Sequence, residues 1–176
     1  MFSPGDIIFY GSTGVCRVEE VKMLGFSKSE KQQLYYILKP VYQECNISAP
    51  VDSNKVFMRP VITKEEAMSL IDTIPSIKAE AFHCSVLRQL VEHYEAAFAS
   101  HECSDLIKLT MSIQEKKRLC QEHKRKLGAL DERFMKRAED LLFGELAVAL
   151  GIEKSDVPDY ISQRLGMAES EVASVS

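Results

Sequence analysis

The chain has 176 residues, 45% of them hydrophobic, so it can bury a core in one or two small domains. Its formal net charge of -4 at pH 7 excludes a uniformly basic nucleic-acid-binding protein, but it does not exclude a local basic patch. No apolar run reaches the roughly 18 residues of a membrane-spanning helix, and the N-terminus has no signal-peptide pattern. We therefore expect a cytoplasmic protein with no membrane partner.

The first sixty residues are predicted to form short β-strands. Proline at positions 50 and 60 frames a connector that follows them. The strand-like runs of β-branched and aromatic residues are residues 7–10, 14–18, 34–38 and 46–49. Strands this short and this closely spaced favour a small, strongly bent antiparallel sheet or barrel.

After the connector the pattern changes to helix. Thr63 and Glu66 have the spacing of a capping box, which predicts a helix that begins there and stops before Pro75. Apolar residues then recur at steps of three and four over residues 87–98, which is typical of an amphipathic helix. A weaker pattern of the same kind predicts a third, long helix over residues 104–127.

The strongest helical pattern begins at Asp131. Two sets of apolar residues repeat there every seven positions: Phe134, Leu141 and Val148, and Met135, Leu142 and Ala149. A face this broad belongs in a helical core, and Gly151 can end the helix. A last short helix is expected at residues 157–165, and residues 167–176 are expected to form a flexible tail.

The sequence contains no catalytic or metal-binding pattern that we can identify. The turn from Gly11 to Gly14 lacks the lysine and the following helix of a phosphate-binding loop. His83 and Cys84 are adjacent, so on a helix their side chains would not face each other. The five cysteines are scattered and include no C-x-x-C pair, which is typical of free thiols. We predict a binding protein with no enzyme activity, cofactor, metal or small-molecule substrate.

Positive charge collects in one part of the chain. Residues 115–137 hold nine lysines and arginines against four acidic residues. A basic segment of this kind can contact phosphate groups of a nucleic acid. The alternative is a solvated helix whose charges pair at i,i+4, and both interpretations are open because the basic residues run around the predicted helix.

Two sets of residues, one near each end of the chain, carry a resemblance to a known family. The first set is Phe2, Pro4, Gly5, Asp6, Tyr10, Gly14, Val15, Val18 and Glu19. The second set is Leu127, Glu132, Arg133, Ala138, Leu141, Leu142, Gly144, Glu145, Leu146 and Ala147. Together they resemble the CarD/CdnL family of bacterial transcription regulators over roughly residues 2–150. The N-terminal module of that family is shared with the RNA-polymerase-interacting domain of the transcription-repair coupling factor.

The resemblance implies an α+β fold, with a small Tudor-like antiparallel β-barrel followed by an all-α helical domain. We assign the barrel to residues 1–62 and the helical domain to residues 63–166. The family implies that the barrel binds the RNA polymerase β subunit by strand pairing, which would leave the Gly11–Gly14 turn as a corner of the sheet. It also implies that the helical domain contacts promoter DNA, weakly and through the DNA backbone, and modulates the stability of the open complex. Such a protein would be associated with the nucleoid through RNA polymerase.

The candidate binding residues follow from the resemblance and from the basic segment. The polymerase-binding candidates are Val21, Leu24, Ile47 and Ser48. Where many family members carry a tryptophan that wedges against a DNA base, this chain, which has no tryptophan, has Leu87. The DNA-binding candidates are Leu87, Arg88, Lys116, Lys117, Lys124, Arg125, Lys126 and Arg133. The alternative function is a protein–protein adaptor without direct DNA contact.

Overall fold

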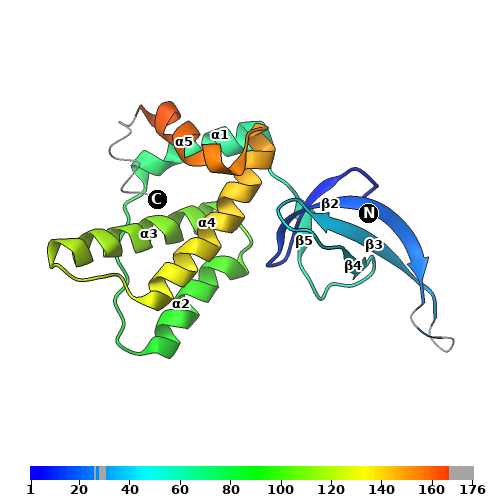
Figure 1. The fold of residues 1–176 in the computed structure, drawn as a ribbon, viewed down its shortest axis with the longest axis horizontal. Helices are drawn as coiled ribbons and strands as arrows, with labels where there is room; N and C mark the ends of the chain where they lie inside the picture. The colour runs from blue at the N-terminus through cyan, green and yellow to red at the C-terminus, as the bar shows by residue number, and fades with distance from the viewer. Residues whose placement is uncertain (26, 28–30, 167–176) are drawn as a thin grey trace. The chain divides into compact units, whose positions relative to one another are not determined.

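The computed structural model describes residues 1–25, 27 and 31–166, and the predicted tail at residues 167–176 lies outside this part. The chain divides into two compact units, Met1–Ile62 and Thr63–Ser176. The first unit contains the strands and the second contains the helices (Figure 1). The predicted α+β class is thereby confirmed.

The N-terminal unit is a single five-stranded sheet in which all pairings are antiparallel. Its strands are β1 (Ile7–Tyr10), β2 (Gly14–Leu24), β3 (Gln33–Pro40), β4 (Ile47–Pro50) and β5 (Met58–Pro60). Their spatial order is β4-β3-β2-β1-β5, so β4 and β5 are the two edges and do not pair with each other. The predicted barrel is therefore not closed within the described strands. Both edge strands are short and end in proline, which lacks the N–H that a further ladder bond would need.

Two features of the backbone bend this sheet. The pairing of β2 with β3 shifts register between Val18 and Glu20, and such a bulge increases the local twist of a strand. The turn between β1 and β2 contains Gly11 and Gly14 at φ values of 45° and 90°, in the region that favours glycine. A Cβ on Gly11 would also lie 2.6 Å from Cγ1 of Val56. The turn is a sheet corner, as its sequence predicts.

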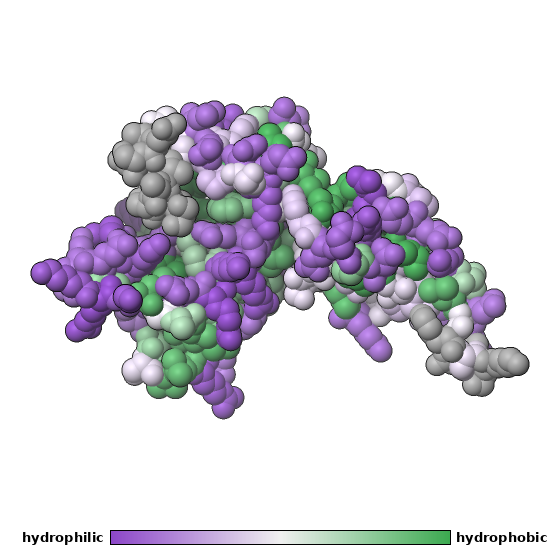
Figure 2. Space-filling view, in the orientation of Figure 1, coloured by the Kyte–Doolittle hydropathy of each residue, from purple (hydrophilic) through white to green (hydrophobic). Residues whose placement is uncertain are grey.

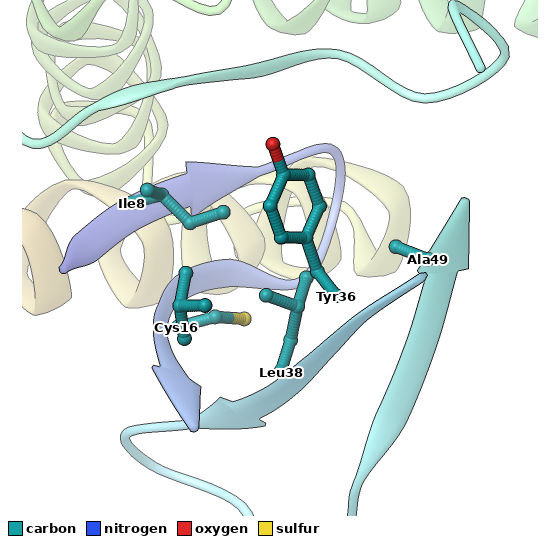
Figure 3. Close-up of a cluster of buried hydrophobic side chains, with 6 residues drawn as sticks. Ile8, Cys16, Tyr36, Leu38 and Ala49 are labelled. Atoms are coloured by element: carbon teal, nitrogen blue, oxygen red, sulfur yellow. The ribbon is translucent and has the colours of Figure 1, made fainter. Parts of the chain in front are cut away.

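One face of the sheet carries the hydrophobic core of this unit. Figure 3 shows side chains of β1, β2, β3 and β4 gathered on that face. The buried cluster consists of Ile8, Cys16, Val18, Tyr36, Leu38 and Ala49. Burial raises the pKa of the Cys16 thiol to about 11, so this cysteine stays neutral and packs as a small hydrophobic residue.

The helical unit is described over residues 63–166. Its α-helices are α1 (Lys64–Thr73), α2 (Leu87–Ala99), α3 (Cys103–Glu122), α4 (Ala129–Leu150) and α5 (Val157–Leu165), with short 3-10 helices η1 (Ile74–Ser76) and η2 (Lys154–Asp156). The predicted capping box begins α1: the Thr63 N–H donates to Glu66 Oε2 at 2.8 Å, and the Glu66 N–H donates to Thr63 Oγ1 at 3.1 Å. Gly151 ends α4 with a φ of 70°, as predicted.

The connection from α3 to α4 differs from the predicted long helix. α3 ends at Glu122 and not at residue 127, and Lys124 adopts a left-handed φ of 52°. The N–H of Arg125 closes the helix end by donating to the Cys120 carbonyl at 2.7 Å. The physical reason is composition, because residues 123–126 carry no apolar side chain that packing could hold in a further helical turn.

α4 lies in the core of the helical unit and buries one side along its length. Phe134, Ala138, Leu142 and Leu146 are all buried at 3% exposure or less. The ring of Tyr94 on α2 packs 5.2 Å from the ring of Phe134, measured between centroids. None of the helices in the described part of the chain is long and apolar enough to cross a membrane.

Candidate functional site: the free edge of the sheet

β4 is the longer of the two edge strands and pairs only with β3 among the described strands. Its register sets Tyr36 opposite Ala49 and Ile37 opposite Ser48. An unpaired edge presents a row of backbone donors and acceptors, to which an extended segment of another protein can add as a further strand.

One hydrogen bond fixes which β4 groups point outward. The Val51 N–H donates to the Leu34 carbonyl at 2.9 Å, directly beyond the end of the β4 ladder. Successive residues of an antiparallel strand alternate between bonding toward the partner and pointing away from it. Ala49 therefore bonds toward β3, whereas Ser48 and Pro50 direct their backbone groups away from it. Because Pro50 has no N–H, Ser48 supplies the outward N–H of β4, and both residues supply outward carbonyl groups.

The predicted polymerase-binding side chains divide between the two faces of the sheet. Val21 and Ile47 are half-buried and pack against the core cluster. The strand register and the alternation of side chains put Leu24 and Ser48 on the opposite face. Ser48 is exposed and Leu24 is half-buried. The four residues therefore do not form one side-chain patch, and what this edge offers is mainly backbone.

Two exposed apolar side chains follow β3, in the loop that leads to β4. Val41 and Tyr42 are each 43% exposed. The exposure of these two side chains could not be predicted from periodicity, because a loop carries no periodic pattern. One feature of the sequence could have indicated this exposed pair. Tyr42 comes directly after Pro40 and Val41, in a segment that is otherwise polar.

The basic candidates of the helical unit occupy very different environments. Lys116 is only 9% exposed, and its Nζ donates to Asp131 Oδ1 at 2.9 Å. The Tyr94 hydroxyl donates to the same oxygen at 2.6 Å, and burial together with this hydrogen bond raises the pKa of Tyr94. Lys116 therefore joins α3 to α4 inside the unit. Lys117 is half-buried.

Three of the exposed basic candidates lie together between α3 and α4. Lys124, Arg125 and Lys126 are all exposed in this connection, and Arg133 is exposed on α4. Figure 2 shows hydrophilic side chains (purple) over the region where α3 passes into α4. Arg118, by contrast, is held by ion pairs to Glu115 and Glu122 on its own helix. The basic segment is thus partly a self-paired helix and partly an exposed connection.

Leu87 and Arg88 begin α2. Leu87 is 67% exposed, and the preceding Val86 is 49% exposed. Figure 2 shows hydrophobic side chains (green) gathered at the lower end of the helical unit, where α2 begins. The Nε of Arg88 pairs with Glu92 Oε1 at 3.0 Å, so its charge is balanced on the same helix.

The described residues contain no group of three His, Cys, Asp or Glu side chains placed to hold a metal ion. All five cysteines are free thiols. The N-terminal unit does offer a preformed sheet with an open edge, to which an extended segment of another protein can add.

The family model of the CarD-like/TRCF RID domain matches residues 2–62, which is nearly the whole of the N-terminal unit. The resemblance predicted from the sequence is confirmed for this unit. The family is one of RNA-polymerase-interacting domains, so it is a family of protein-interaction domains with a role in transcription and not a known family of enzymes. No curated protein matches the chain.

Proposed function

We propose that the protein is a transcription regulator that binds the β subunit of RNA polymerase through the free edge of β4. The observation that carries this proposal is the open edge strand in a unit that matches the CarD-like/TRCF RID domain. A strand of the β subunit adds to β4 and takes up the outward N–H and carbonyl of Ser48 and the outward carbonyl of Pro50. This interaction would associate the protein with the nucleoid through RNA polymerase.

The core residues of β4 support this role by holding the edge in place before the partner arrives. Ala49 is fully buried and Ile47 packs against the core cluster, so the strand does not have to be ordered on binding. Preorganisation of this kind lowers the entropic cost of association. The loop that leads into β4 also exposes the apolar side chains of Val41 and Tyr42.

The decisive experiment replaces Ser48 in the full chain. Ser48→Pro removes the outward N–H of β4 and leaves the bonds toward β3 in place, so the sheet is expected to remain folded. Ser48→Ala keeps the N–H and removes only the hydroxyl, and it is the matched control. In a pull-down, the affinity of Ser48→Pro for the β subunit should fall at least about tenfold. The reason is that one backbone hydrogen bond cannot form and the proline ring blocks the incoming strand.

Ser48→Ala should bind like the unchanged protein, and circular dichroism should show the same sheet in both variants. Retention of the β subunit by folded Ser48→Pro at unchanged affinity would mean that β4 is not the docking strand.

We further propose that the helical unit modulates open-complex stability through weak contacts to the DNA backbone. The exposed connection with Lys124, Arg125 and Lys126 supports this part of the proposal. The adaptor alternative is favoured by a different observation, namely that Lys116 and Arg118 are engaged in ion pairs within the unit. Fewer cations are therefore available for phosphate groups than the sequence suggests.

A further inference from the structure

The helical unit contains a cavity that neither polymerase binding nor DNA contact uses. Its volume is about 290 Å³, and it lies among α3, α4 and α5. The apolar part of its wall includes Ile107, Met111, Phe143 and Ile161. This size is close to the lower limit of the roughly 300–1,000 Å³ of ligand pockets in proteins.

The polar groups in the wall are mostly hydrogen-bond acceptors. The Thr110 hydroxyl donates its hydrogen to the Ile107 carbonyl at 2.8 Å, and the Ser162 hydroxyl donates to the Pro158 carbonyl at 3.0 Å. Each oxygen can therefore only accept a hydrogen bond from the cavity. Gln114 also lines the wall. A ligand that fits this wall is apolar and carries a hydrogen-bond donor.

Glu139 gives the cavity a negative charge. The residue lines the wall and is half-buried, and among the described residues its carboxylate has no hydrogen-bond or ion-pair partner. Burial raises its pKa, the neighbouring Asp140 adds to the rise, and Lys117 of α3 opposes it. A partly desolvated carboxylate with acceptors around it is stabilised by a cation that reaches it.

We propose that the cavity between α3, α4 and α5 binds a small, largely apolar organic amine, whose ammonium group pairs with Glu139. The apolar body of the ligand lies against Met111, Phe143 and Ile161, and the ammonium hydrogens bond to the Glu139 carboxylate. Charge complementarity selects the amine over a neutral molecule of the same shape. The inference is independent of the proposed polymerase contact, because all of these residues belong to the helical unit.

Two probes of matched shape test the proposal on the full chain: 2-(1-naphthyl)ethylamine and neutral 1-ethylnaphthalene. The chain has no tryptophan, so naphthyl fluorescence reports binding without interference from an indole. The amine should bind with a Kd below about 1 mM and raise the Tm, since a ligand that binds the folded state stabilises it. The neutral probe should bind about tenfold more weakly, because it cannot form the charge-assisted bond.

Two variants localise the binding. Glu139→Gln should weaken the amine about tenfold and leave the neutral probe unchanged, because only the charge is lost. Thr110→Leu should weaken both probes, because the larger side chain enters the cavity. Equal affinity of the amine for Glu139→Gln and for the unchanged protein would overturn the proposal. The proposal would also be overturned if the amine bound to a chain that ends at Gly166 but not to the full chain. In that case the cavity of the full chain would not be open to a free ligand.

Discussion

Asp131 lies in the first turn of α4 with 4% of its surface exposed, and its carboxylate accepts hydrogen bonds from side chains of two other helices. A buried carboxylate is costly unless a positive charge and hydrogen-bond donors replace the lost water. Lys116 supplies the charge and Tyr94 supplies a further donor. The three side chains tie α2, α3 and α4 together at one point, so they fix how these helices are aligned.

Removing the charge of Asp131 should therefore destabilise the helical unit strongly. Asp131→Asn leaves the Lys116 ammonium buried without a counter-charge, which costs about 3–5 kcal/mol of unfolding free energy. Tyr94→Phe removes one hydrogen bond and should cost about 1–3 kcal/mol. Urea unfolding of the full chain, followed by circular dichroism at 222 nm, measures both.

A matched exposed pair provides the control for this prediction. Arg88 and Glu92 are joined at 3.0 Å on the surface of α2, and Glu92→Gln should cost less than about 0.5 kcal/mol. Similar losses for Asp131→Asn and Glu92→Gln would show that the buried cluster does not carry the alignment of the helices.

Helices could be predicted from the sequence where one local pattern decides the structure. The seven-residue repeat around Leu142 and the capping box at Thr63 each predicted a helix that the structure contains. Elements that depend on distant partners were harder to predict. β5 has only three residues and exists because it pairs with β1, and nothing within its own sequence indicates that pairing.

The candidate site shows the same limit. The strand that contains Ser48 was predicted from its own residues, but which of its backbone groups face outward follows from the register with β3. The burial of Lys116 was missed for a related reason. A lysine in a basic helix is predicted to be exposed, and its partner Asp131 lies 15 positions away in sequence. The cavity beside Glu139 likewise depends on the packing of three helices.

α4 is the element whose packing can be tested most directly. Leu142 is 3% exposed, and Leu142→Ala should cost about 2–5 kcal/mol of unfolding free energy, because it removes buried apolar contacts and enlarges an existing cavity. Lys136→Ala, on the exposed side of the same helix, is the control and should change stability by less than about 0.5 kcal/mol. Chemical denaturation measures both. A loss below about 1 kcal/mol for Leu142→Ala would contradict the packing described for α4.

At the scale of the whole molecule, the two units carry different chemistry. The sheet unit has its own hydrophobic core within residues 1–62 and presents backbone groups at an open edge. The helical unit presents cations in the connection from α3 to α4 and apolar side chains at the start of α2. In the proposed function, the sheet unit docks strongly on polymerase and the helical unit acts weakly on DNA. Docking raises the effective concentration of the second unit near DNA, so a contact too weak to be seen in free solution can still change an equilibrium.

The contribution of the helical unit is tested by reversing the charge of the exposed connection. Replacing Lys124, Arg125 and Lys126 together with glutamate should shorten the lifetime of the open complex, because the proposed contact to DNA phosphates would become repulsive. The amount of β subunit recovered in a pull-down should be unchanged, since the proposed polymerase contact lies on the sheet unit. The difference in open-complex lifetime between the triple variant and the unchanged protein should shrink as salt is raised, because each phosphate contact releases counterions.

Leu87→Ala, at the exposed start of α2, should change the open-complex lifetime less than the triple variant does, because an aliphatic side chain lacks the broad ring that stacks on a base. Equal open-complex lifetimes for the triple variant and the unchanged protein, at both low and moderate salt, would mean that the connection is only a solvated surface. The protein would then act on polymerase as an adaptor, without touching DNA.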